Sequence, residues 1–255
     1  MGIHQSGLSR EMLIAGLRDE CSLEQAGMAV DLLDKGEGRL PQGTRQLPTE
    51  VVQAMQRARV IAAMVNAASE IGYCTVTVQD VIDRAGLSRP TFYEHFTDRH
   101  DCFVAAVETS AAVLRSRVDA AALQGEDIWR ERMRLGLQEL LRFVATEPDA
   151  ACTLLVEAKS ANSRAMELHD ELFTYFAERL DLLRRRLLPT VPESSAAVQV
   201  ATVGGVEALL YPRLLEHRVD GIESLLPTLM YLVVLLYEGH EAAGEAIAGA
   251  EFASA

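Results

Sequence analysis

The chain has 255 residues, of which 49% are apolar, and it carries 24 Lys and Arg against 37 Asp and Glu, a net charge of −13. This length allows one large core, or a small domain followed by a larger one. A protein this acidic has no general attraction to nucleic acid, so any contact with DNA must come from a local patch.

We expect no segment of this chain to enter a membrane. Charged residues such as Arg10, Glu11 and Arg18 interrupt the first twenty positions, which is not typical of a signal peptide. The longest apolar run, 225–237, contains Pro227 and is too short to span a bilayer. The four cysteines are widely spaced without a C-x-x-C pair, which favours free thiols in a reducing compartment. We therefore predict a cytoplasmic protein with no membrane partner.

Residues 1–48 are predicted to form an N-terminal helical extension and linker. Ser9 and Ser22 are placed to cap two amphipathic segments, and Gly36 would end the second of them. The stretch from Gly36 to Pro48 is rich in Gly and Pro, which is typical of a linker.

Three helices are predicted next. Apolar residues at helical spacing indicate a helix over 49–71. Thr77 and Asp80 form the capping box of a second helix, which Gly86 ends. A third, short helix begins at Ser88 after a tight turn. Two helices joined in this way form the helix-turn-helix layout.

The rest of the chain is predicted to consist of longer helices, so the fold class is all-α. Apolar stripes separated by Pro indicate a second helical domain over 104–241. The small residues of 242–255 predict a flexible tail.

The short helix after the turn has the composition of a DNA-reading element. In a helix-turn-helix, the second helix enters the major groove by its N-terminal end. Ser88 and Thr91 are short hydroxyl residues of the kind that reach phosphates, and Arg89 has the planar fork that suits guanine O6 and N7. Phe92 and Phe96 are one helical turn apart and are expected to anchor the helix from its inner face.

These residues resemble the tetracycline-repressor (TetR) family of transcription regulators. The stretch that carries the resemblance reads Thr77-Val-Gln-Asp-Val-Ile-Asp-Arg-Ala-Gly-Leu-Ser-Arg-Pro-Thr-Phe-Tyr-Glu-His-Phe-Thr-Asp-Arg-His-Asp-Cys-Phe103. The DNA-binding domain is placed at 49–103, and the helical remainder matches the family only in length and layout. The resemblance implies a repressor that a small-molecule effector releases from a palindromic double-stranded DNA operator. It implies no cofactor.

The resemblance also implies roles for single residues. Thr77 would cap the second helix and touch phosphate, while Gln79 and Arg89 would read base edges. The remaining DNA contacts are expected from a set of residues on the third helix and the start of the next: Ser88, Pro90, Thr91, Tyr93, His95 and Arg99.

The charge of this region leaves a second interpretation open. Residues 77–103 carry three Arg against five Asp and Glu, a net charge of −2. The alternative is a helical scaffold or interaction protein of the same fold that does not bind DNA. Arg39 and Arg45 in the linker would reach a minor groove or flanking phosphates, although a solvated linker is the interpretation that we favour.

The resemblance further implies that 104–241 binds the effector and forms a homodimer. Gly204 and Gly205 lie on a small-residue helix face, and 225–237 is apolar nearly all round. A helix of that kind must be buried on every side, either in a four-helix bundle across a two-fold axis or in a core within one chain. Because of the resemblance, we favour the bundle between two chains. The effector candidates, each of which also suits a core, are Trp129, Phe143, Cys152, Glu157, His169, Phe173, Phe176 and Tyr211.

We do not expect an enzyme. The sequence contains no G-x-S-x-G turn, no phosphate loop, no dinucleotide fingerprint and no pair of metal-ligand motifs. The run 184–186 of three Arg is a candidate for a second nucleic-acid patch, although a solvated helix face is the interpretation that we favour.

Overall fold

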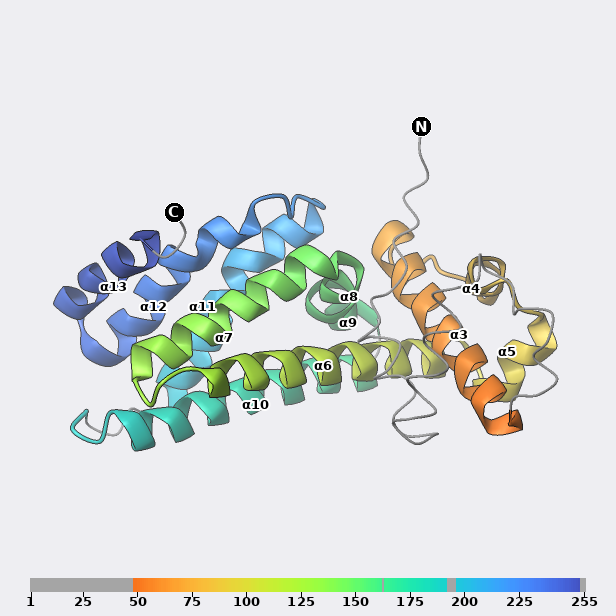
Figure 1. The fold of residues 1–255 in the computed structure, drawn as a ribbon. Coiled ribbons are helices and arrows are strands. Elements are labelled where there is room, and N and C mark those ends of the chain that lie inside the picture. Colours follow the sequence, from red (N-terminus) through yellow and green to blue (C-terminus); the bar gives the residue numbers. More distant parts are fainter. Residues whose placement is uncertain (1–47, 162, 192–195, 253–255) are drawn as a thin grey trace. The chain divides into compact units, whose positions relative to one another are not determined.

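The computed structural model describes residues 48–161, 163–191 and 196–252, so the expectations for 1–47 lie outside it. Within these ranges the chain forms helices and turns without a β-strand (Figure 1), which confirms the all-α prediction. None of the helices described there is long and apolar enough to cross a bilayer. The boundaries expected at 48, 103 and 241 stay predictions.

The contacts between Cα atoms divide the described residues into two compact units. The first unit holds the residues up to Val113 together with Cys152–Met166. The second unit holds Leu114–Ala151 together with the residues from Glu167 onward.

The first unit is built around a long amphipathic helix. Its helices, in chain order, are α3 (Thr49–Ile71), α4 (Val78–Ala85), α5 (Arg89–His95) and the first half of α6 (Arg99–Gln124). Tyr73 stacks on Phe103 with 3.9 Å between ring centroids, and both residues are buried. Apolar burial of this kind supplies most of the stability of a small helical unit.

The capping residues predicted from the sequence act as predicted. The Thr77 side chain accepts the Asp80 N–H, while the Asp80 carboxylate accepts the Thr77 N–H at 2.8 Å. Gly86 ends α4 in the left-handed region at φ 62°, which costs Gly little because it has no Cβ. The Ser88 side chain then accepts the Thr91 N–H at the start of α5. These caps fix the turn of the helix-turn-helix.

The segment 148–161 contains a turn that is wider than an α-helical turn. It consists of α8 (Pro148–Cys152), the π-helical turn η2 (Thr153–Glu157) and α9 (Ala158–Ala161). The Glu157 carboxylate accepts the Tyr73 N–H at 2.7 Å, and the Thr153 hydroxyl donates to the Val65 carbonyl at 3.4 Å. Both bonds tie this segment to the end of α3 within the first unit.

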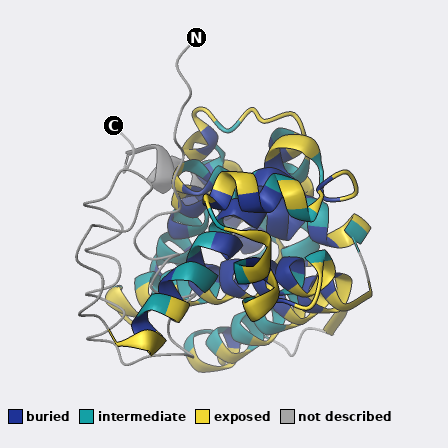
Figure 2. Ribbon diagram, turned by 90° about the vertical axis from the view of Figure 1, so that its right-hand side faces the viewer, coloured by how far each residue is buried: buried dark blue, intermediate teal, exposed yellow. Residues whose placement is uncertain are grey.

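The second unit is a set of long helices. Figure 2 shows that helices of the described chain have both buried and exposed faces. The second unit contains the second half of α6, α7 (Trp129–Thr146), α10 (Ser163–Leu187), α11 (Ala196–Leu215), the short 3-10 turn η3 (Ile222–Leu225), α12 (Leu226–Glu238) and α13 (His240–Phe252). Six of the thirteen α12 residues are buried within the chain, whereas Leu236 is 38% exposed. The apolar character of α12 is therefore explained largely by packing within one copy.

The tail that we expected from 242 onward is a helix as far as Phe252. Arg130 of α7 pairs with Glu238 at 3.1 Å and with Glu245 at 3.1 Å. Ala243 is fully buried against the rest of the unit. The small residues that suggested a tail are mainly Ala, which has the highest helix propensity and allows close packing.

The two adjacent glycines of α11 serve different purposes. A Cβ at Gly205 would lie 2.8 Å from Cδ2 of Leu232 on α12, whereas a Cβ at Gly204 would meet nothing within 4 Å. Gly205 therefore permits the close approach of α11 and α12 within one chain. Gly204 belongs instead to an open apolar face of α11 that includes Val200, which is 61% exposed.

This difference predicts opposite outcomes for two neighbouring substitutions. Gly205→Val should lower the free energy of unfolding by about 1–3 kcal/mol, because the added methyl groups overpack the contact with Leu232. Gly204→Val should change the stability of a single copy by less than about 0.5 kcal/mol, because a Cβ there meets nothing within 4 Å in the same chain. Urea denaturation of both variants at one protein concentration checks this, and equal losses would show that α11 packs differently.

Candidate DNA-reading helix and effector cavity

The nine residues predicted to contact DNA all lie in the first unit. Six of them are exposed, as a docking surface requires: Thr77, Gln79, Ser88, Arg89, Pro90 and Tyr93. Thr91, His95 and Arg99 are half-buried. The structure therefore brings most of the predicted set to solvent on α4, α5 and the turn between them.

Arg89 is the freest cation of this surface. It is exposed at the first position of α5, and it makes no hydrogen bond or ion pair with any residue that the structure describes. Ser88 and Thr91 beside it bond to each other through their hydroxyls at 2.8 Å while capping the helix. A planar guanidinium in this position is available for bidentate contact with a base edge.

The inner face of α5 is fixed by aromatic packing. Phe92 is fully buried and Phe96 is 3% exposed, with 5.8 Å between their ring centroids. The guanidinium of Arg57 lies over the Phe96 ring at 5.2 Å. Tyr93 meets Phe92 edge-on at 5.3 Å and is 49% exposed, so its hydroxyl end points to solvent.

Arg99 is engaged in the fold rather than free for phosphate. Its Nη1 donates to the carbonyl of Val76 at 2.7 Å and to that of Tyr73 at 3.4 Å. Its guanidinium also lies over the Tyr73 ring at 5.2 Å. These contacts hold the chain between α3 and α4, so this structure gives Arg99 a positioning role for the turn.

Other polar residues of the surface are also held by neighbours. Gln79 donates to the Asp83 carboxylate at 2.8 Å, and His95 lies 3.4 Å from the Gln56 side chain. Hydrogen bonds from Thr77 hold the pKa of the Asp80 carboxyl below its usual range. Asp80 therefore keeps its negative charge at neutral pH, which preserves the acidic character of the surface.

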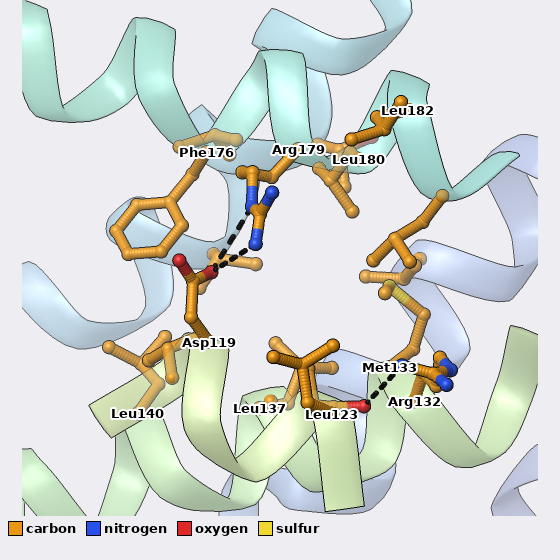
Figure 3. Close-up of a pocket in the computed structure, with 18 of the residues that line it drawn as sticks. Asp119, Leu123, Arg132, Met133, Leu137, Leu140, Phe176, Arg179, Leu180 and Leu182 are labelled. Atoms are coloured by element: carbon orange, nitrogen blue, oxygen red, sulfur yellow. Dashed lines mark hydrogen bonds and ion pairs between the residues drawn. The ribbon is translucent and has the colours of Figure 1, made fainter. Parts of the chain in front are cut away.

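The second unit contains a cavity of about 280 Å³ (Figure 3). Helices α6, α7, α10, α11 and α12 all contribute to its wall. Apolar side chains predominate, and the charged ones are Asp119, Arg132, Arg179 and Arg186. The volume lies near the lower limit of ligand pockets, which are roughly 300–1,000 Å³. A slender apolar molecule suits this space.

The charges at the cavity wall form two groups. Arg179 donates to Asp119 at 3.2 Å, and Asp119 also accepts the Tyr175 hydroxyl. Burial, and then the bond to Asp119, raises the pKa of Tyr175. Arg132 and Arg186 form the other group, and Asp127 pairs with both, at 2.5 Å and 2.9 Å. Within the Arg run at 184–186, Arg184 is buried, whereas Arg186 is 61% exposed and also lines the cavity.

Of the eight predicted effector residues, Phe176 alone lines this cavity. Trp129 packs on Tyr237 at 5.1 Å, and Phe143 is buried under the Arg117 guanidinium. His169 is buried 3.0 Å from Glu207 and stacks on Phe173. Tyr211 is half-buried on α11.

Cys152 and Glu157 of the predicted set belong to the first unit. The leucines and arginines that do line the cavity were treated in the sequence as core and surface residues. No group of three or more His, Cys, Asp and Glu side chains within the described ranges is placed to hold a metal ion.

Comparison with known proteins agrees with the helix-turn-helix. Residues 60–106 match the family model of bacterial regulatory proteins of the tetR family. This match covers the helix-turn-helix that α4 and α5 form. The HTH-type transcriptional activator FasR of Mycolicibacterium smegmatis is 23% identical over 149 residues, which are 52% of this chain and 67% of FasR.

Two solved structures of regulators share the fold of this chain. The fatty acid degradation regulator FadR from Bacillus halodurans gives a TM-score of 0.64 at 14% identity, covering 70% of this chain and 94% of that one. FadR from Bacillus subtilis in complex with stearoyl-CoA gives 0.61 at 15% identity, covering 71% and 97%. The chain is thus a DNA-binding regulator in sequence motif and in fold.

Two arginines of the helix-turn-helix region should behave differently when removed. The DNA probe is a duplex that the wild-type protein selects from a random pool, and a scrambled duplex is the reference. Arg89→Ala should weaken binding to the selected duplex by about 1–3 kcal/mol. It should therefore lower the ratio of the affinity for the selected duplex to the affinity for the scrambled duplex. The melting temperature should not change, because Arg89 is exposed and unpaired among the described residues. Arg89→Lys, which keeps the charge without the fork, is the matched control.

Arg99→Ala should instead lower the free energy of unfolding by roughly 1–2 kcal/mol, because it leaves backbone carbonyls without their charged donor. Arg99→Ala should weaken binding to the selected duplex and to the scrambled duplex by the same factor. Anisotropy titrations and thermal melts on the same samples measure these effects. An unchanged ratio for Arg89→Ala would show that Arg89 does not read a base.

Proposed function

We propose that this chain is a homodimeric regulator whose affinity for a palindromic operator is lowered by a long-chain acyl ligand, free or joined to coenzyme A, bound in the cavity of the second unit. The observation that carries the proposal is the cavity itself, apolar along its length with arginines at its wall. An acyl chain is slender and apolar, and its polar end is an acceptor that arginine recognises. The stearoyl-CoA held by the Bacillus subtilis FadR supports the same chemistry in a similar fold.

The DNA contacts are proposed from the exposed residues of the first unit. Arg89 and Gln79 read base edges, and Thr77, Ser88, Pro90, Thr91, Tyr93 and His95 contact the groove or the backbone. Arg99 supports them by holding the turn before α4. The acidic charge of this surface is the observation that supports the scaffold alternative. If the wild-type protein selects no duplex from a random pool, that alternative replaces DNA binding.

A homodimer is proposed through the open face of α11. Val200 and Leu215 are 61% and 54% exposed there, and Gly204 allows another helix to approach closely. Two copies present two reading helices, which compensates for the weak charge of each. Regulators act where the chromosome is, so we place the protein in the cytoplasm.

Addition of stearoyl-CoA should weaken binding of the selected duplex, because a ligand that prefers the DNA-free state shifts the equilibrium toward it. The expected change is about fivefold or more, the usual size of such coupling. Anisotropy titrations below the micellar concentration measure it, and light scattering on the same samples should give twice the 27.9 kDa of one chain.

Gly136→Leu supplies the matched test, because Gly136 lines the cavity and a large side chain there fills it. This variant should bind the duplex and lose the response to stearoyl-CoA. Gly244→Leu, on α13 with nothing within 4 Å of its Cβ, is the control that should respond normally. If stearoyl-CoA strengthens binding of the duplex, the proposal that the ligand lowers the affinity for DNA is wrong. If Gly136→Leu responds to stearoyl-CoA as the wild type does, the ligand does not bind in this cavity.

A further inference from the structure

Arg132 is a buried charge with an unused donor. Its side chain is only 9% exposed at the cavity wall. Nη1 donates to the Ala122 carbonyl at 3.0 Å and Nη2 to Asp127 at 2.5 Å. The third donor, Nε, is buried and has no hydrogen-bond partner among the residues that the structure describes. A buried N–H group without a hydrogen-bond partner costs free energy. The requirements of folding alone therefore do not explain this position of Arg132.

Arg179, which is half-buried at the wall, is in a different state. The Nε of Arg179 donates to Asp119 at 3.2 Å, and its Nη2 lies 3.2 Å from the same oxygen. One carboxylate therefore neutralises one guanidinium in that group. In the group around Arg132, Asp127 alone faces both Arg132 and Arg186, so this group keeps an excess positive charge.

The two groups lie toward different sides of the cavity (Figure 3). Arg132 is on the side of Met133, and the Asp119–Arg179 pair is on the side of Phe176. Apolar side chains such as Leu137 line the space between them. A molecule with one polar end thus has one favourable orientation, with its acceptor at Arg132 and its apolar part directed away from it.

We propose that Arg132 is the specificity-determining residue of the cavity, and that its guanidinium binds the acceptor oxygen at the polar end of the acyl ligand. This assignment rests on the proposed function. The oxygen is a carboxylate oxygen in a free fatty acid and the thioester carbonyl oxygen in an acyl-CoA. Asp127 competes with that oxygen for the same guanidinium, and its place in the turn between α6 and α7 links ligand binding to the end of α6.

The test compares binding of stearate and of stearoyl-CoA to the full chain by isothermal titration calorimetry. Arg132→Met, which keeps the length and loses the donors, should weaken binding by roughly ten- to a hundredfold. Arg179→Met is the matched control, because it removes the other arginine that pairs with an aspartate at this wall, and its charge is already neutralised by Asp119. Its affinity should stay within about threefold of wild type. If Arg132→Met loses affinity for stearate alone, the group that Arg132 binds is the carboxylate. If it loses affinity for both probes, or for stearoyl-CoA alone, the group is the carbonyl oxygen.

A second variant guards against misfolding of the first. Asp127→Asn removes the competing charge from an exposed position, so it should bind stearate several-fold more tightly, a gain that a damaged fold does not produce. If Arg132→Met binds as tightly as the wild type, or if Arg179→Met loses as much affinity as Arg132→Met, the assignment of Arg132 is wrong. The proposed function is not affected by either result. Failure of the wild type to bind either probe overturns both.

Discussion

A helix of seven residues has no stability of its own in water, and α5, which carries the expected base contacts, is that short. Its existence and its direction depend on the burial of Phe92 and Phe96. The caps at Gly86 and Ser88 determine only where it begins. Because the anchor is apolar and rigid, the first turn of the helix, which carries Arg89, is held in one orientation. Sequence-specific contact with a base edge requires such a fixed orientation.

The net charge of −13 has different consequences for the two binding sites. It opposes approach to DNA, so a DNA-binding surface with few free cations depends on hydrogen bonds and on two copies acting together. In the second unit, three arginines and one aspartate line an otherwise apolar cavity. Positive charge in a cavity of low polarity acts more strongly than it does in water. An acidic protein with a cationic cavity therefore selects an anionic or strongly accepting ligand there.

The parts of the fold that follow local rules were predictable from the sequence. The capping box at Thr77, the glycine stop at Gly86 and the cap at Ser88 are each determined by residues within one turn. The exposure of Arg89 followed from the same pattern. The inward direction of Arg99 did not, because it depends on carbonyl groups more than twenty residues earlier in the chain.

The cavity was least predictable, since a leucine that lines a space and one that fills it have the same helical spacing. Stripes such as Met133–Leu137–Leu140 were correctly expected to face inward, without a sign that they enclose a volume. Aromatic residues were favoured as ligand contacts, yet Trp129 and Phe143 pack in the core. Helix α13 was not predicted, because its small residues are also typical of a flexible tail. The ion pair between its Glu245 and Arg130 of α7 depends on the tertiary fold.

Coupling between the cavity and the DNA-reading helix is the central claim, and thermodynamic reciprocity tests it most directly. If stearoyl-CoA lowers the affinity for the selected duplex by a given factor, the duplex must lower the affinity for stearoyl-CoA by the same factor. The measurement is the dissociation constant of stearoyl-CoA with and without saturating selected duplex, with a scrambled duplex as control. Equal factors above about five support the account. A ligand affinity that saturating selected duplex leaves unchanged would contradict it.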